Sequence, residues 1–395
     1  MVRSRGVVYV TIADLIVRSA YQMGKTPLLP IFAASIGAGD VLLGLIVSVS
    51  TMTGIFFKPF VGFLSDRYGR RMWLIVGTSF FVGVPFVYRF VNSPEQLLLV
   101  RMIHGVATSI YGPVTLAYVA EQSQYGRGER LAWFSMARNI GYVIGPALAG
   151  YMLLWMTPVA VFTFIGIVSS LAILPMIYLP DTISSRSQRN SNILLQGLRA
   201  FGYVSRIPMV WLGGGLRATM FIALYAVKAF LPIYALSIGM NIALVGIFFA
   251  LQEMIHILLS PASGRIGDVI GYHVAVTSGM VILAFALILV ATVDSIFLLV
   301  VVASMMGFAR SLVFPSVVAS VSHKVDGENL GIGMGVLGSI QNTGKVLGPA
   351  LAGVLVHWFD YIFTFQFIGI ILLIGAFIGF CYSQYRNRFI QIEQM

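Results

Sequence analysis

Charged residues are scarce in this chain: Asp, Glu, Lys and Arg make up only 10% of the 395 residues, whereas hydrophobic residues make up 58%. Soluble globular domains carry about 25% charged residues. A chain this apolar would expose large hydrophobic patches in water, so an ordinary soluble protein is excluded and a membrane protein is indicated. The mean hydropathy of +0.91 agrees with that interpretation.

Acidic residues and cysteine are rarer still. The chain has 14 Asp and Glu against 25 Lys and Arg, a net charge of +11, and one cysteine, Cys381. A single cysteine excludes an intramolecular disulfide. The basic excess alone could indicate nucleic acid as a partner. The basic residues alternate with long apolar runs instead of forming one stripe, so we expect no nucleic acid partner.

Motifs for nucleotide hydrolysis and for common hydrolases are also missing. H-E-x-x-H and G-x-S-x-G are absent, and the residues before Gly344-Lys345 do not have P-loop spacing. G-M-G-V-L-G at 333–338 lies in an apolar run with no strand before it, which indicates small-residue helix packing. The E-x-x-H pattern occurs once, whereas a diiron bundle needs two such pairs. We therefore expect no enzyme activity, no cofactor and no metal.

Long apolar runs are what the chain has in abundance, with lengths near the roughly 20 residues that cross a bilayer. Backbone groups have no water partner in lipid, so these runs must be helices. The alternating pattern of a barrel is absent, and no cleavable signal peptide is evident. The sequence predicts an all-α membrane protein with twelve transmembrane helices, at 7–36, 41–64, 72–91, 97–120, 131–154, 158–180, 209–238, 242–263, 274–292, 296–320, 331–356 and 361–383.

Orientation follows from the loops, because cytoplasmic loops carry an excess of Lys and Arg. With both termini in the cytoplasm, the cytoplasmic segments hold fifteen basic residues and the opposite loops none. The longest loop, 181–208, is polar and basic. We predict an N-terminal six-helix bundle at 1–180, a cytoplasmic linker at 181–208 and a C-terminal six-helix bundle at 209–395.

The two predicted bundles repeat one another. LPIFAASIG at 29–37 recurs as LPIYALSIG at 231–239, with seven of nine residues identical and an offset of 202. GPALAG at 145–150 recurs at 348–353, and the pair Gly62 and Asp66 matches Gly264 and Asp268. Matches that keep one register over several helix pairs indicate a parallel repeat. Parallel repeats about a shared midplane site are what alternating access uses.

Residues 62–71, GFLSDRYGRR, resemble the signature of the loop between helices 2 and 3 in the major facilitator superfamily. VRMIHG at 100–105 is similar to that family's helix 4 motif, although His104 stands where Gln is commoner. GYVIGPALAG at 141–150 resembles the helix 5 motif G-x-x-x-G-P-x-x-G-G, with Ala149 in place of one Gly. The resemblance implies a transporter of the drug:proton antiporter branch.

These motifs supply the residues that we predict to gate the cycle: Gly62, Asp66, Arg67, Gly69, Arg70, Arg101, Gly145, Pro146 and Asp268. An acid such as Asp66 adds nothing to membrane anchoring, so a charge cluster that forms in one conformation is the better interpretation. For Arg70 and Arg71, simple anchoring by the positive-inside effect is an equal alternative. Gly145 and Pro146 also suit close helix packing.

Charges inside the predicted spans are the most informative residues, since a charge at the bilayer centre costs at least about 2.5–3.5 kcal/mol. The spans hold ten basic residues but only two acids, Asp14 and Glu253. Either the cavity is wet and positive or an anion fills it. We predict that five of the basic residues bind substrate: Arg18, Arg138, Arg217, Arg310 and Lys345.

The two acids predict the proton carriers. Asp14 and Arg18 have i,i+4 spacing, so they share a helix face and could form a structural pair. Glu253 and His256 have i,i+3 spacing in the middle of a span. Burial and nearby cations shift a carboxyl's affinity for protons in opposite directions, which suits a proton carrier. We assign proton coupling to Glu253, Asp14 and His256; a helix-packing Glu–His pair is the alternative.

The sequence thus predicts a secondary active transporter, a proton-coupled exporter of a small organic or amphipathic compound that is anionic or zwitterionic. An organic anion exchanger or symporter of the same fold is the alternative. A receptor or enzyme would need an appended domain or catalytic cluster, and neither is present. The expected partners are the small-molecule substrate, protons and the lipid bilayer. We expect a monomer in the cell membrane.

Overall fold

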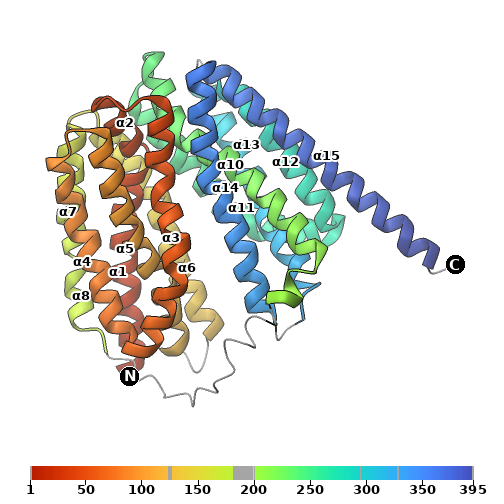
Figure 1. Ribbon diagram of the computed structural model, residues 1–395, viewed down its shortest axis with the longest axis horizontal. Helices are drawn as coiled ribbons and strands as arrows, with labels where there is room; N and C mark the ends of the chain where they lie inside the picture. Colours follow the sequence, from red (N-terminus) through yellow and green to blue (C-terminus); the bar gives the residue numbers. More distant parts are fainter. Residues whose placement is uncertain are drawn as a thin grey trace. The chain divides into compact units, whose positions relative to one another are not determined.

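The computed structural model describes residues 2–122, 127–180, 199, 201–293, 295–326 and 329–393, and every regular element in these ranges is helical (Figure 1). Side chains are described at the same positions except 2–4, 66, 127–128 and 382–393. The absence of strands from this part of the chain agrees with the predicted all-α class.

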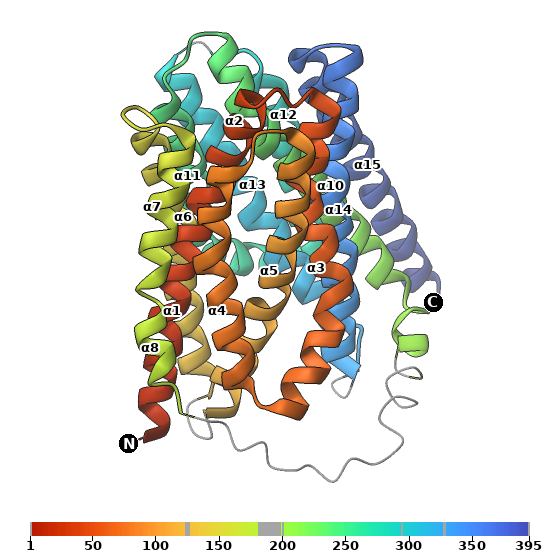
Figure 2. The same cartoon turned by 60° about the vertical axis from the view of Figure 1, so that its left-hand side comes forward.

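The N-terminal half contains long helices joined by short turns (Figure 2). They are α1 (Val2–Lys25), α2 (Leu28–Ser35), α3 (Asp40–Tyr68), α4 (Arg70–Val87), a short 3-10 turn η1 (Tyr88–Phe90), α5 (Pro94–Gln122), α6 (Arg127–Met152), α7 (Pro158–Ser170) and α8 (Ile173–Ile177). The C-terminal half contains α10 (Pro208–Ser237), α11 (Ile242–Ile270), α12 (Tyr272–Val290), α13 (Ile296–Ser322), α14 (Leu330–Trp358) and α15 (Tyr361–Glu393).

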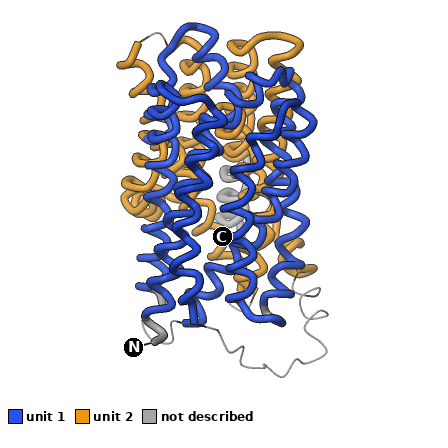
Figure 3. Tube along the Cα trace, turned by 90° about the vertical axis from the view of Figure 1, so that its left-hand side faces the viewer, with its two compact units in different colours: residues 1–187, 228–250 blue, residues 188–227, 251–395 orange. Residues whose placement is uncertain are grey.

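Two compact units make up the chain (Figure 3). Unit 1 comprises Met1–Ser187 and Lys228–Ala250, and unit 2 comprises Gln188–Val227 and Leu251–Met395. The boundaries between the units divide α10 and α11. The predicted bundles at 1–180 and 209–395 stay a prediction, and most of the predicted linker, residues 181–198 and 200, lies outside the described residues.

Nine helical segments in the described ranges are long and apolar enough to cross a membrane: Asp40–Ser65, Arg70–Phe90, Pro94–Gln122, Pro158–Ile177, Pro208–Ser237, Ile242–Ile270, Tyr272–Val290, Ile296–Ser322 and Tyr361–Cys381. The long helices α1, α6 and α14 are not among them; α1 and α6 carry charges along their length, and α14 is rich in Gly and polar residues. The count of twelve spans and the cytoplasmic placement of the termini therefore stay predictions.

Local sequence explains several helix boundaries. Thr157 caps α7 by accepting a hydrogen bond from the backbone N–H of Ala160, and Pro158 occupies the first helical position, where its missing N–H has no cost. Ser295 caps α13 in the same way by accepting from the N–H of Leu298. These caps satisfy backbone donors that would otherwise be unpaired at a helix start.

The repeat extends to the backbone conformation of the turns. Gly69, between α3 and α4, has φ 90°, and Gly271, between α11 and α12, has φ 92°. Gly37 and Gly239, which end the two LPI-containing segments, have φ 87° and 76°. Each pair is separated by 202 residues. Because only glycine adopts this conformation without strain, the same turn is encoded in both halves.

Close helix crossings repeat as well. A Cβ on Gly105 of α5 would lie 2.7 Å from the backbone oxygen of Ser50 in α3, and one on Gly307 of α13 would lie 2.6 Å from that of Gln252 in α11. Gly145 of α6 approaches α1 just as closely, with Ser19 O at 2.9 Å. Helices associate in membranes largely through such small residues. The glycines thus fix which helices pack together within each unit.

Candidate functional site

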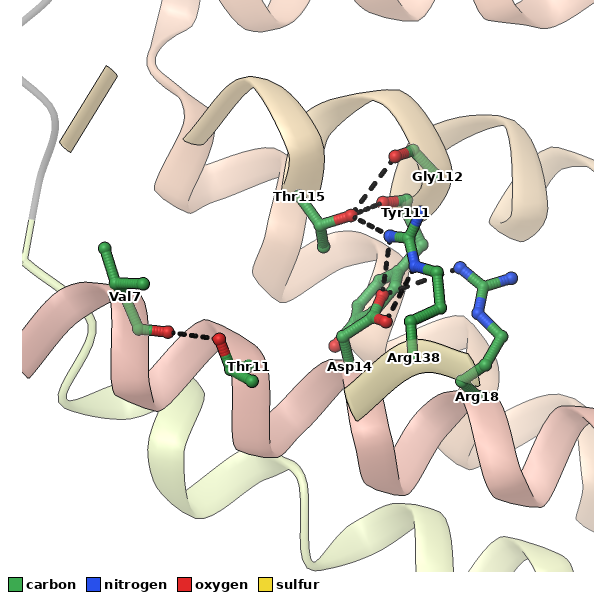
Figure 4. Close-up of polar contacts among 8 residues, drawn as sticks. All are labelled: Val7, Thr11, Asp14, Arg18, Tyr111, Gly112, Thr115 and Arg138. Carbon is green, nitrogen blue, oxygen red and sulfur yellow. Dashed lines mark hydrogen bonds and ion pairs between the residues drawn. The ribbon is translucent and has the colours of Figure 1, made fainter. Parts of the chain in front are cut away.

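Asp14 of α1 is the centre of a buried charge cluster in unit 1 (Figure 4). Its side chain is only 1% exposed. Arg138 of α6 contacts the Asp14 carboxylate in a bidentate manner: Nε donates to Oδ2 and Nη2 donates to Oδ1, each at 3.0 Å. Arg18 Nη2 lies 3.5 Å from Oδ1, so the pairing suggested by the i,i+4 spacing is observed. One carboxylate therefore faces two guanidinium groups.

Arg138 has further contacts that hold it in place. Its Nη2 also donates to Thr115 Oγ1 of α5 at 2.8 Å, and its guanidinium carbon lies 4.7 Å from the centre of the Phe134 ring. Thr115 in turn donates to the Tyr111 carbonyl at 2.6 Å. The cluster consequently ties α1, α5 and α6 together. A bidentate, charge-assisted contact of this kind is among the stronger side-chain interactions.

Glu253 and Arg310 form a buried ion pair in unit 2. Arg310 Nη1 of α13 donates to Glu253 Oε1 of α11 at 2.6 Å, and the side chains of Arg310 and Glu253 are 15% and 4% exposed. His256, one turn later on α11, packs its ring edge-on to Phe314 with centres 5.9 Å apart. Glu253 and His256 thus lie beside the same arginine-bearing helix.

Arg217 of α10 differs from the other arginines because it has no acidic partner within the described residues. It is 5% exposed, its Nε has no hydrogen-bond partner, and its guanidinium carbon lies 3.8 Å from the centre of the Phe314 ring. Arg310 is close enough to repel it electrostatically. Stacking on a ring leaves the N–H edges of a guanidinium available, which suits recognition of a carboxylate or phosphate.

A reciprocal arrangement joins α10 and α13. Each helix carries an Arg followed four residues later by a Phe: Arg217 and Phe221 on α10, Arg310 and Phe314 on α13. Each guanidinium lies over the ring of the other helix, at 3.8 Å for Arg217 over Phe314 and 5.8 Å for Arg310 over Phe221. Lys345 Nζ lies 4.9 Å from the Phe221 ring centre and donates to Asn342 Oδ1 at 3.0 Å. We call Arg217, Phe221, Arg310, Phe314 and Lys345 the unit 2 basic cluster.

The predicted gating residues fall in several places. Arg70, at the start of α4, pairs with Glu121 at the end of α5, a partner that sequence reasoning missed. Arg67 lies over the ring of Tyr68, with its guanidinium carbon 5.5 Å from the ring centre. The side chain of Asp66 lies outside the described part of the structure.

The repeat relates the Arg70–Glu121 contact of unit 1 to a contact at the equivalent positions of unit 2. Adding 202 to Arg70 and Glu121 gives Tyr272 and His323, and the Tyr272 hydroxyl lies 3.2 Å from His323 Nε2. The same hydroxyl donates to Asp268 Oδ1 at 2.7 Å, so Asp268 belongs to this contact. The structure therefore places the predicted Asp268 beside two residues that were not predicted.

Arg101 lies away from that end of unit 1. It is near the start of α5, whereas Glu121 is near its end, and 20 helical residues span about 30 Å. Arg101 is 1% exposed, and its Nη2 donates to Ser50 Oγ at 2.6 Å. Gly145 and Pro146 lie within α6, where Gly145 packs against α1. The structure thus does not bring these three residues together with Arg70.

No group of three or more His, Cys, Asp or Glu side chains able to hold a metal ion occurs among the residues that the structure describes. The arrangement instead presents buried arginines, each near one carboxylate or none. Such an arrangement can bind an anion or exchange a proton at a carboxylate.

Comparisons with known proteins agree with the fold. The family model of the Major Facilitator Superfamily matches residues 16–255 and 216–388. An uncharacterized MFS-type transporter of Methanocaldococcus jannaschii is 22% identical over 90% of this chain and 92% of its own length. Multidrug resistance protein 2 of Bacillus subtilis is 22% identical over 91% of both chains. The crystal structure of a mutant of the nucleoside transporter NupG aligns with a TM-score of 0.84 at 14% identity, covering 95% of this chain and 99% of that one.

The predicted resemblance is therefore confirmed. The family match covers most of the chain, the relatives are transporters, and apolar helices of membrane-spanning length run through both units. This chain belongs to the Major Facilitator Superfamily, and it is a multi-pass transporter of the cell membrane, not an enzyme.

Proposed function

We propose that this protein is a proton-coupled exporter that works by alternating access and carries a small organic compound with a carboxylate or phosphate group, most simply a zwitterion. The family and the multidrug resistance relatives support export. The observation that carries the substrate class is Arg217, a buried arginine that lies near Arg310 and has no acidic partner in the described residues.

The candidate substrate residues differ in whether a nearby carboxylate neutralises their positive charge. Asp14 already neutralises one charge of the Arg18 and Arg138 pair, and Glu253 neutralises Arg310. An isolated buried charge is costly unless a partner compensates it. Arg217 is therefore the residue with most to gain from an anionic ligand, and Arg138 is the one with least.

Glu253 supplies a route to proton coupling. A zwitterion could place its carboxylate on Arg217 and its ammonium on Glu253. A proton on Glu253 would then compete with the substrate, because the neutral acid no longer attracts the ammonium group. Mutually exclusive binding of proton and substrate to one site is the requirement for antiport.

The ion pair between Glu253 and Arg310 also supports an alternative, in which the substrate is a simple anion that is transported together with a proton. Protonation of Glu253 would release Arg310, since the neutral acid no longer holds the guanidinium. Arg310 could then bind the anion together with Arg217, so proton and substrate would bind in synergy. Synergy of this kind produces symport. The charge of the substrate thus decides between the two proposals.

A binding series tests both. The purified protein in nanodiscs is titrated with zwitterionic, anionic and neutral analogues of one scaffold, at acidic and alkaline pH. Arg217→Gln should weaken the charged ligands about tenfold or more, as expected for loss of a charge-assisted hydrogen bond, and leave neutral analogues unchanged. Arg206→Gln, which removes an exposed positive charge from the same unit, is the matched control.

The comparison of acidic with alkaline pH should show opposite changes in ligand affinity for the two mechanisms. Acid should weaken a zwitterion if proton and substrate compete, and strengthen an anion if they bind together. Equal affinities for charged and neutral analogues in the parent and in Arg217→Gln would exclude Arg217 as the anion contact. An affinity that is independent of pH for every ligand would exclude Glu253 as the coupling acid.

A further inference from the structure

A second group of buried basic residues lies in unit 1, close enough to Arg18 of the Asp14 cluster to interact with it electrostatically. Arg101 of α5 is 1% exposed, Lys25 at the end of α1 is 8% exposed, and His104 of α5 is 6% exposed. Arg101 Nη2 donates to Ser50 Oγ at 2.6 Å, and Tyr21 and Tyr88 are close enough to interact with Arg101 electrostatically. No Asp or Glu pairs with Arg101 within the described residues. We name this group the unit 1 basic cluster; its members are Tyr21, Lys25, Ser50, Tyr88, Arg101 and His104.

The hydrogen bonds of Arg101, Tyr88 and His104 show which nitrogen atoms of the cluster have no acceptor. The positive Arg101 guanidinium attracts the oxygen of the nearby Tyr88 hydroxyl, so the hydroxyl proton points away from Arg101. His104 Nδ1 lies 3.4 Å from the Tyr88 hydroxyl and is the available acceptor. Neutral His104 then carries its proton on Nε2. That nitrogen is buried without a hydrogen-bond partner, as is Arg101 Nε.

A small cavity lies beside His104. Its lining includes His104, Tyr21, Tyr88 and Ser169 together with apolar side chains from α4 and α7. The rings of Tyr21 and Phe81 meet the His104 imidazole at steep angles, with centres 5.2 Å and 5.4 Å away. Aromatic walls beside an N–H donor suit a weakly hydrated ion better than a large polar molecule.

We propose that the unit 1 basic cluster binds one small monovalent anion, chloride under ordinary conditions, with His104 Nε2–H as a direct donor. The anion supplies an acceptor for His104 Nε2–H and compensates the buried charge of Arg101, which pairs with no carboxylate of the described residues. Burying cations in this way is unfavourable unless a counter-charge is present. The residues of this site all belong to unit 1, whereas the proposed substrate contact Arg217 belongs to unit 2.

The repeat provides an internal control. At an offset of 202, the positions of Lys25, Arg101 and His104 in unit 2 are Val227, Ala303 and Met306. None of these side chains can donate a hydrogen bond to an anion or carry a charge. The proposal therefore requires one site in each chain, located in unit 1 and missing from the matching place in unit 2.

Bromide substitution tests the proposal directly. Crystals of the full chain grown in bromide should show one anomalous peak within hydrogen-bond distance of His104 Nε2, and none at Met306. In solution, thermal unfolding in detergent is followed while chloride replaces gluconate at constant ionic strength. The melting temperature should rise with chloride and saturate, since a ligand that binds only the folded state stabilises it.

Two substitutions of His104 separate the donor from the packing. His104→Gln keeps an N–H donor and His104→Leu removes it, so the chloride concentration for half-saturation should rise about tenfold or more only in the leucine variant. A water molecule in place of a bromide peak would overturn the proposal. So would melting temperatures that are equal in chloride and gluconate, or identical chloride titrations of the two variants. The bromide map of the parent decides the matter if neither variant folds.

Discussion

Replacing Asp14 by Asn should destabilise unit 1 more than any other single charge removal in its buried cluster. Arg138 contacts the carboxylate through two hydrogen bonds of 3.0 Å, Arg18 lies 3.5 Å away, and Asp14 is 1% exposed. Removing one partner of a buried ion pair costs about 3–5 kcal/mol, because the other charge stays buried. In Asp14→Asn two guanidinium groups would be left together, so we expect a loss within that range.

Arg138→Gln should cost less, since Asp14 keeps Arg18 as a partner at 3.5 Å. The double variant Asp14→Asn/Arg138→Gln restores the net charge of the parent cluster, with Arg18 as its single cation. It should therefore be more stable than Asp14→Asn alone, by about 0.5–3 kcal/mol, as for interacting pairs in general.

The assay is thermal unfolding of each variant in the same detergent, followed by tryptophan fluorescence and by the loss of monodisperse protein. A loss of 3–5 kcal/mol corresponds to a decrease of roughly 5–10 °C in the melting temperature. Two results would refute the reasoning. One is an Asp14→Asn protein as stable as the parent, and the other is a double variant no more stable than Asp14→Asn.

Three further predictions concern coupling, gating and packing. Glu253→Gln cannot ionise, so transport into inside-out vesicles should no longer respond to a pH gradient while substrate exchange persists; a remaining response would assign the proton to another acid. Glu121→Gln removes the ion-pair partner of Arg70 and should slow transport in proteoliposomes without changing the amount of folded protein, whereas full transport would leave Arg70 as a membrane anchor. Gly348→Ala should lower the melting temperature because a Cβ there would meet the backbone of α10, whereas Gly338→Ala, with open space around it, should not; equal effects would refute the packing argument.

The sequence was sufficient to predict the features that depend on composition and on the spacing of residues along the chain. Apolar runs predicted helices, and turns such as those at Gly69 and Gly271 depend on the positive φ of a single glycine. The repeat followed from identities at an offset of 202 residues, and of 203 for the GPALAG segments. The pairing of Asp14 with Arg18 followed from helix geometry, since residues four apart share a face.

Only the tertiary structure decided which of the buried arginines have their charge neutralised by a carboxylate. Arg138 and Asp14 are 124 residues apart and Arg310 and Glu253 are 57 apart, and each pair depends on how two helices are rotated toward each other. Hydrophobic patterning specifies that rotation weakly in a membrane helix, because the lipid-facing side is apolar as well as the packed side. The sequence therefore predicted four arginines and one lysine as substrate residues without separating them by charge compensation. The packing of α10 against α13 distinguished Arg217, which is buried on Phe314 without an acid among the described residues, from the arginines whose charge a carboxylate already balances.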